Sequence, residues 1–282
     1  MSHTSYRLCT LYSGSTGNAA YLETPYARIL IDAGKCTKTL LASLKTIGVD
    51  IATVDAIFIT HDHNDHVGAL EVLTKKHPIP VHILYKSALR YQSTQPEALC
   101  ACLKMYRTPD EVHEIIGNVT VTAFQTPHDS RDSMGFRMTV NAEDGEHMIG
   151  YATDIGHVSD AVRSGLTGCE SVVLESNHDE EMLKNGLYPY DLKVRILSRK
   201  GHLSNRDCAD FACVLYEHGT RNLLLAHLSE HNNVPDIAYD ETYSALAGLP
   251  VNLMVASPVD VTMLVGDPSA PIPKQARAEV LV

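Results

Sequence analysis

The segment IFITHDHNDHVGAL constrains the fold and the chemistry of this chain more than any other. Its apolar, β-branched start predicts a buried strand over Ala56–Thr60, and its end predicts a helix that begins at His66 or Val67. Four side chains that bind metals follow the strand within six residues: His61, His63, Asp65 and His66. Imidazole and carboxylate ligands suit zinc, iron or manganese, and no thiol indicates a cysteine-type structural zinc. The alternative is a chance group of histidines on a solvated loop.

Short apolar runs bounded by Gly, Pro, Asn or Asp recur along the chain and predict further strands. They cover Tyr6–Leu11, Ala19–Glu23, Arg28–Asp32, Val81–Leu84, Val119–Gln125, Gly135–Val140, Met148–Ala152, Ser171–Glu175, Leu223–Ala226 and Asn252–Val255. Helical periodicity lies between some of them, at Thr37–Ile47, Val67–Lys76 and Asn205–Glu217. The 282 residues therefore predict one α/β domain over residues 1–265, with two sheets between helices, and an extended tail over 266–282. The strand rhythm lapses over Lys86–Glu114, which is a candidate insertion.

The composition is that of an acidic globular protein. Hydrophobic residues make up 44%, and Lys+Arg 23 against Asp+Glu 34 gives a formal net charge of −11. This charge excludes binding of nucleic acid by bulk positive charge, although a local basic groove is compatible with it. No apolar run has the length of a signal peptide core or a membrane span, and the seven cysteines form no CxxC pair. We therefore expect a cytoplasmic protein with reduced thiols and no membrane partner.

The run His61-x-His63-x-Asp65-His66 resembles the HxHxDH signature of the metallo-β-lactamase-fold hydrolases. This resemblance calls for a further His, an Asp and a last His after later strands, and three residues of the chain match these positions. They are His128, Asp154 and His227. Loops at strand ends commonly gather functional side chains into one site. A lone His128 would be an ordinary loop residue, but its place in a series of matching strand ends favours a functional role.

The resemblance to the metallo-β-lactamase-fold hydrolases implies a fold as well as a site. Proteins of this family are αββα sandwiches of two mixed β-sheets, which agrees with the strands and helices predicted above. The resemblance implies two divalent metal ions per chain, zinc or manganese, with iron also compatible. It assigns one ion to His61, His63 and His128, the other to Asp65, His66 and His227, and a bridging position to Asp154. Such a set implies hydrolysis of a phosphodiester, lactone or thioester by a metal-bridging hydroxide.

Further motifs make the chain similar to one branch of this family, the YycJ (WalJ) branch. They are SGSTGN, IDAG, TPHD, YATDIG, LESNHD, KGHLSN and AHLSEHNN, and the resemblance runs from about Ser5 to Ala256. This branch implies a metal-dependent nuclease or phosphodiesterase, described in related proteins as a double-stranded DNA exonuclease. The resemblance therefore implies DNA, bound at its ends, as the substrate.

His202 lies in the segment GHLS, just before the predicted helix Asn205–Glu217. A similar segment in ribonuclease-Z-like relatives supplies a histidine at the scissile phosphate. The resemblance thus implies that His202 protonates the leaving oxygen or stabilises charge on phosphorus, while Asp65 holds or accepts a proton from the attacking water. The alternative for His202 is a structural place beside the helix start, with Ser204 or Asn205 as the cap.

Predicted substrate contacts lie in the loops around this site. Ser15 and Asn18 belong to a small-residue turn, which either presents N–H and hydroxyl groups to the site or is an ordinary turn. Arg131 and Lys200 are candidate phosphate contacts. Lys200 belongs to the densest positive run of the chain, for which a solvated helix face is the alternative; the run contains Lys193, Arg195, Arg199, Lys200 and Arg206.

His178 is a further candidate substrate contact, in the motif LESNHD. Glu175 ends the preceding strand and is placed to orient a nearby histidine. Alternatively, Asp179 and the two glutamates after it form only the acidic first turn of a helix.

Two other functions stay open at this point. One is a small-molecule hydrolase, such as a cyclic phosphodiesterase, lactonase or thioesterase. The other is a metal-binding regulatory protein without turnover. The sequence carries no signal for the native metal, the polarity of digestion or the oligomeric state.

Overall fold

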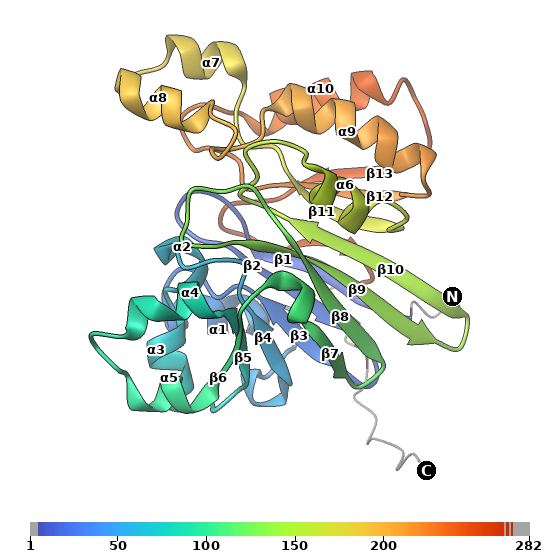
Figure 1. Cartoon of the computed structure of the whole chain (residues 1–282). Helices are drawn as coiled ribbons and strands as arrows, with labels where there is room; N and C mark the ends of the chain where they lie inside the picture. The colour runs from blue at the N-terminus through green and yellow to red at the C-terminus, as the bar shows by residue number, and fades with distance from the viewer. Residues whose placement is uncertain (1–4, 268, 271, 273–282) are drawn as a thin grey trace.

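The computed structural model describes residues 5–267, 269, 270 and 272, and its strands form two seven-stranded sheets packed face to face (Figure 1). The first sheet contains, in spatial order, β14 (Thr262–Val265), β1 (Arg7–Tyr12), β2 (Ala19–Glu23), β3 (Arg28–Ile31), β4 (Ala56–Phe58), β5 (Val81–Leu84) and β6 (Leu103–Tyr106). The second contains β13 (Asn252–Val255), β12 (Asn222–Ala226), β11 (Ser171–Glu175), β10 (Gly145–Ala152), β9 (Met134–Ala142), β8 (Val119–Gln125) and β7 (His113–Ile116). Both sheets are mixed, with parallel pairing from β3 to β6 and from β10 to β13.

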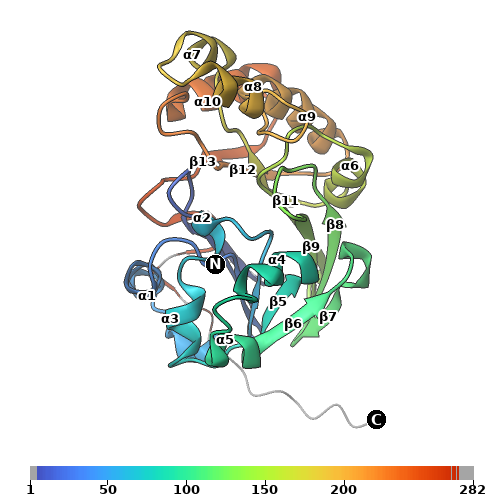
Figure 2. The ribbon, with the colours of Figure 1, turned by 60° about the vertical axis from the view of Figure 1, so that its left-hand side comes forward.

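Helices cover the outer face of each sheet, which gives an αββα sandwich (Figures 1 and 2). The first sheet carries α1 (Thr37–Thr46), α2 (Asn64–Val67), α3 (Leu70–Thr74), α4 (Tyr85–Ala88) and α5 (Glu97–Cys102). The second carries α6 (Asp160–Leu166), α9 (Asn205–Glu217) and α10 (Pro235–Ala245), with α7 (Glu180–Asn185) and α8 (Tyr190–Ile196) beside them. Short 3₁₀ turns lie at η1 (Ile51–Thr53), η2 (Leu89–Tyr91) and η3 (Pro109–Glu111).

Three apolar layers hold the sandwich together, because side chains alternate between the two faces of each strand. In β11, Val172 and Leu174 pack under the outer helices, whereas Val173 packs between the two sheets. In β1, Leu11 packs under α1 and Leu8 lies between the sheets. Burial on both faces explains why these strands read as continuous apolar runs in the sequence.

The predicted insertion over Lys86–Glu114 is wrong. This segment supplies β6 and β7, which are the edge strands of the first and second sheets. Met105 in β6 is 54% exposed and Ile115 in β7 is 65% exposed, so neither strand has the apolar run of a buried strand. The sequence analysis also missed β14, another edge strand, although Thr262–Val265 is a short apolar run before Gly266.

The structure corrects one predicted helix start and decides between two predicted caps of another helix. α2 begins at Asn64, before the predicted start at His66 or Val67, and Gly68 and Ala69 separate it from α3. α9 begins at Asn205 as predicted, but its cap is Ser204, whose Oγ accepts a hydrogen bond from the Asp207 N–H at 3.1 Å.

The predicted tail over residues 266–282 lies mostly outside the described residues. Its described start contacts the first sheet, because the carbonyl of Asp267 accepts a hydrogen bond from Arg7 at 3.3 Å. Over the described ranges, no helix is long and apolar enough to cross a membrane. All seven cysteines are free.

The carboxyl ends of the parallel strands lie at one end of the sandwich, and a buried ion cluster lies at the opposite end. There the Glu23 carboxylate, fully buried at the end of β2, pairs with Arg7 and with Arg28, whose Nε lies 2.9 Å from Glu23 Oε1. Two guanidinium groups share this carboxylate, so its removal leaves buried positive charge without a partner.

We therefore expect Glu23→Gln to lower the free energy of unfolding by about 3–5 kcal/mol. Urea denaturation followed by circular dichroism measures the change. Glu146→Gln, at an exposed position of β10, is the matched control and should change stability little. A loss below about 1 kcal/mol for Glu23→Gln would show that the ion cluster contributes little to the stability of strands β1 to β3.

Candidate metal centre and active site

The loop after β4 is held against two other loops by backbone hydrogen bonds. The N–H of Ala33 donates to the carbonyl of His66, and the N–H of Asn18 donates to the carbonyl of Asp65, both at 2.7 Å. Gly34 lies between them, and a Cβ there would stand 1.9 Å from the Asp65 carbonyl oxygen. The glycine of the IDAG motif is therefore required by close backbone approach.

Three site residues adopt the left-handed backbone conformation directly after strands. The φ angles are 61° at Asp32 after β3, 56° at Asp154 after β10 and 58° at His227 after β12. Such a conformation costs of order 1–3 kcal/mol for a residue with a side chain, and it recurs at functional sites. At these three strand ends the strained backbone lowers stability and sets the direction in which the side chain points.

The seven predicted ligands lie around one point at this edge of the sandwich. One group of neighbouring ligand atoms belongs to His61, His63 and His128, and a second belongs to Asp65, His66 and His227. Asp154 lies between the groups, with Oδ2 3.2 Å from His66 Nε2 and Oδ1 3.7 Å from His128 Nε2. Two further groups overlap with these: His61, His66 and Asp154, and Asp154, Glu175, His202 and His227.

Unpaired buried atoms show that a divalent cation fits this cluster. His61 Nε2, His227 Nε2 and Asp154 Oδ2 are buried and have no hydrogen-bond partner among the described residues. Each such atom costs about 1–3 kcal/mol unless something binds it. His128 Nε2 lies 3.3 Å from His63 Nδ1, about the separation of two ligands on one tetrahedral zinc with bonds of about 2.0–2.1 Å.

A second set of groups orients the predicted ligands. The buried Asp32 carboxylate accepts a hydrogen bond from His66 Nδ1 at 2.7 Å and from the Thr60 N–H at 2.9 Å. His128 Nδ1 donates to the carbonyl of Gly201 at 3.2 Å. In both histidines the Nε2 atom is thereby directed to the cluster. The sequence analysis missed the role of Asp32, whose signal was an acid at a strand end in IDAG.

Glu175, at the end of β11, has the most contacts of these orienting groups. Its Oε1 accepts hydrogen bonds from His202 Nδ1 at 2.8 Å and from His227 Nδ1 at 2.9 Å. Its Oε2 accepts from the backbone N–H groups of Ile155, at 2.7 Å, and Leu203, at 3.2 Å. The carboxylate is fully buried and holds a predicted ligand and the predicted acid in one arrangement. The prediction that Glu175 orients His178 is wrong.

The charges in the cluster shift the pKa values in opposite directions. Burial opposes the protonation of His227, but Asp154, Asp65 and Glu175 raise its pKa to about 10. Burial likewise opposes the ionisation of Glu175, but the neighbouring His202 and His227 hold its pKa at about 2. Burial lowers the pKa of His61 well below its usual value. A cation that binds here has to displace the proton of His227.

A cavity of about 220 Å³ opens beside the cluster. The predicted ligands His63, Asp65, Asp154 and His227 form one wall. The other walls include His202, whose side chain is 20% exposed, and residues of α8. A substrate in this cavity reaches both the cluster and His202.

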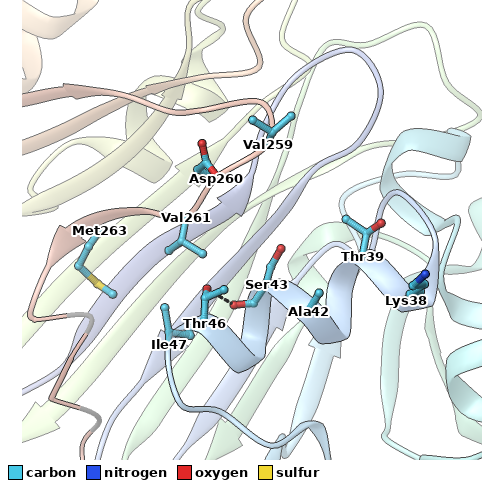
Figure 3. A pocket seen from close by; sticks show the side chains of 10 residues that line it. All are labelled: Lys38, Thr39, Ala42, Ser43, Thr46, Ile47, Val259, Asp260, Val261 and Met263. Atoms are coloured by element: carbon cyan, nitrogen blue, oxygen red, sulfur yellow. Dashed lines mark hydrogen bonds between the residues drawn. The ribbon is translucent and has the colours of Figure 1, made fainter.

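A larger hollow of about 710 Å³ lies elsewhere, between α1 and the segment 259–263 (Figure 3). Figure 3 shows Ser43 and Thr46 of α1 on one side and Val259, Asp260 and Val261 on the other. No candidate metal group among the described residues includes a side chain of this hollow. We therefore place the chemistry in the smaller cavity.

The predicted substrate contacts in the first loop differ in accessibility. Ser15 lines the cavity. Asn18 is fully buried, and its Nδ2 lies 3.1 Å from His66 Nε2 and donates to the Gly14 carbonyl at 3.1 Å. Asn18 therefore contacts the cluster and its own loop.

The other predicted substrate contacts lie outside the described lining of the cavity. Arg131 pairs with Asp62, with Nε 3.2 Å from Oδ2, and Lys200 is exposed just before His202. His178 is buried, which lowers its pKa to about 4, and neither ring nitrogen has a hydrogen-bond partner in the part of the chain that the structure describes. The acidic residues after it do form the first turn of α7, with Asp179 as the cap.

Known proteins resemble this chain in sequence and in fold. The model of the β-lactamase superfamily domain matches residues 27–228, which include all seven predicted ligands. Exodeoxyribonuclease YycJ of Bacillus anthracis is 34% identical over 228 residues, covering 81% of this chain and 84% of the relative. Exodeoxyribonuclease WalJ of Streptococcus pneumoniae serotype 2 is 31% identical over 252 residues, covering 88% and 90%. The metallo-β-lactamase fold protein YhfI of Bacillus subtilis has a TM-score of 0.68 at 17% identity, covering 92% of this chain and 99% of that one.

Fold, site and relatives together define a metal-dependent hydrolase. The chain belongs to the β-lactamase superfamily, with the metallo-β-lactamase fold, and is similar to YycJ and WalJ over most of its length. The fold class and the family predicted from the sequence are thereby confirmed.

We expect Asp32→Asn to weaken zinc binding about 10- to 100-fold, because the variant no longer holds His66 with a charged acceptor. Competition with a chromophoric chelator measures the affinity. Asp110→Asn, at an exposed carboxylate far along the chain, is the control and should bind zinc like the parent. An unchanged affinity in a folded Asp32→Asn protein would show that Asp32 does not support the site.

Proposed function

We propose that this chain is a binuclear metal-dependent nuclease that cleaves phosphodiester bonds in DNA and works from strand ends. The observation that carries the proposal is the cavity between the cluster of seven predicted ligands and His202. Glu175 holds His202 in place through a hydrogen bond. Phosphodiester hydrolysis needs positive charge near phosphorus and a proton for the leaving oxygen, and this cavity offers a place for both. The names of the relatives YycJ and WalJ, both exodeoxyribonucleases, support DNA as the substrate.

Two groups of three ligands, with Asp154 in reach of both, support two divalent ions rather than one. Nitrogen and oxygen ligands accept zinc or manganese, so availability decides between them. Bound ions at such a site lower the pKa of water and neutralise negative charge that develops on the phosphoryl group.

The chain's own residues have distinct tasks in this proposal. Asp65 reaches the cavity with a side chain that is 23% exposed, and its carboxylate holds the attacking water and takes its proton. Glu175 fixes His202 through Nδ1, which leaves Nε2 to protonate the leaving oxygen. Burial opposes the protonation of His202, but Glu175 raises its pKa above the usual value, so the acid form persists nearer neutral pH.

The first test is the hydrolysis of end-labelled linear duplex DNA by the purified protein with manganese and with zinc. We expect stepwise loss of nucleotides by the parent and none by Asp65→Ala. Activity on bis(p-nitrophenyl) phosphate without any on DNA would instead favour a small-molecule phosphodiesterase. Failure on both, with metal bound, would contradict the proposal.

The second test separates the acid from the metal ligands. His202→Ala should lower kcat by roughly a hundredfold, because the leaving oxygen loses its proton donor, and should keep the parent's metal content. His218→Ala, at the exposed end of α9, is the matched control. Equal rates in His202→Ala and the parent would remove His202 from the mechanism.

A further inference from the structure

The cavity beside the cluster holds one permanently positive side chain among the described residues that line it. This is Arg195, in the last turn of α8. The carboxylates of Asp65, Asp129 and Asp154 line the same cavity. Arg195 is therefore the one described lining side chain that attracts an anionic substrate by itself. The histidines attract an anion only when protonated, and the carboxylates only through a bound cation.

Asp129 occupies the space between Arg195 and the cluster. Its carboxylate pairs with the Arg195 guanidinium through Nε and through Nη2, the latter 3.1 Å from Oδ1. The same Oδ1 lies 3.5 Å from His128 Nε2, a predicted ligand atom. A carboxylate oxygen thus bridges the guanidinium and the edge of the metal cluster.

We infer that Arg195 binds a phosphate group of the substrate, and that Asp129 holds the position of this phosphate in the free protein. The inference rests on the proposed function and adds the residue that recognises the DNA backbone. A guanidinium fork pairs with carboxylate and with phosphate oxygens in the same two-pronged geometry. A phosphate can therefore replace the Asp129 carboxylate without a change in the position of Arg195.

The exchange costs little because the ion pair is partly solvated. The Arg195 side chain is 56% exposed and that of Asp129 is 23% exposed. Pairs of this exposure contribute about 0–1 kcal/mol. A phosphate in the same place contacts both Arg195 and the cluster. It therefore gains the attraction of bound cations in addition to the ion pair with Arg195.

The charge around α8 agrees with a polyanionic substrate. Residues 180–200 contain five basic and three acidic side chains in a chain whose net charge is −11. Arg199 and Lys200 continue the positive charge from Arg195 towards the loop that carries His202. The segment that carries Arg195 is thus locally basic in an acidic protein, which favours contact with a polyanion.

The competing explanation is that Arg195 and Asp129 only fasten α8 to the loop after β8. The two explanations predict different results for the two partners of the pair. If the pair is only a fastener, removing either partner has the same effect. If Arg195 binds phosphate, then removing Arg195 weakens DNA binding, whereas neutralising Asp129 leaves it unchanged or strengthens it.

The test compares the parent with Arg195→Ala, Arg195→Lys and Asp129→Asn on duplex DNA in manganese. Arg195→Ala should raise KM about tenfold or more and change kcat less than threefold, and Arg195→Lys should recover part of the loss. Asp129→Asn should leave KM equal or lower. The double variant Lys75→Ala/Lys76→Ala, on the exposed end of α3, is the control and should match the parent.

A second readout separates phosphate contact from structure. Fluorescence anisotropy with a labelled duplex in manganese, in the slowed His202→Ala background, gives Kd at several salt concentrations. Arg195→Ala should reduce the slope of log Kd against log salt by about one, because one phosphate contact is lost. A structural role does not change this slope in that way.

Three outcomes overturn the inference. They are an Arg195→Ala protein with the parent's KM and salt slope, equal shifts of KM in the same direction for Arg195→Ala and Asp129→Asn, and loss of bound metal from either variant. If the parent degrades DNA, these outcomes leave the proposed function intact. If the parent neither degrades nor binds DNA, the proposed function and the inference fall together.

Discussion

The site depends on the buried carboxylate of Glu175. A carboxylate out of water is costly unless its oxygens are fully bonded, and here two histidine rings and two backbone N–H groups bond them. The same four bonds join the ends of β10, β11 and β12 to the loop before α9. Because one group makes all of them, the predicted acid His202 and the predicted ligand His227 cannot move independently. This one carboxylate thus fixes the two rings relative to each other.

Neither sheet contains a complete site. The first sheet supplies the loop after β4 and its support Asp32, whereas the second supplies His128, Asp154, Glu175 and His227. The layer of apolar side chains between the sheets fixes the distance between these halves. Packing of the core therefore determines how the predicted ligands lie relative to one another. The left-handed residues near three strand ends add local backbone strain at the same place.

The lining of the cavity combines both signs of charge. It is negative near the cluster, through Asp65 and Asp154, and it contains the Arg195 guanidinium on α8, which pairs with Asp129. A net charge of −11 is therefore compatible with the proposed polyanionic substrate, because a few side chains set the charge of the cavity.

Most of the strands could be predicted from the sequence, because apolar runs between turn residues are a local pattern. The loop after β4 offered four candidate ligands in the same local way, whereas His128, Asp154 and His227 became candidates through the resemblance to the family. The sequence did not determine the edge strands β6 and β7, whose exposed residues interrupt any apolar run, and the sequence analysis also missed β14, although Thr262–Val265 is an apolar run. Nor did it determine the partners of Glu175, the burial of Asn18 or the pair of Arg195 with Asp129, which are 66 residues apart. Those contacts join distant segments, and only the packing of two sheets brings such segments within hydrogen-bond distance.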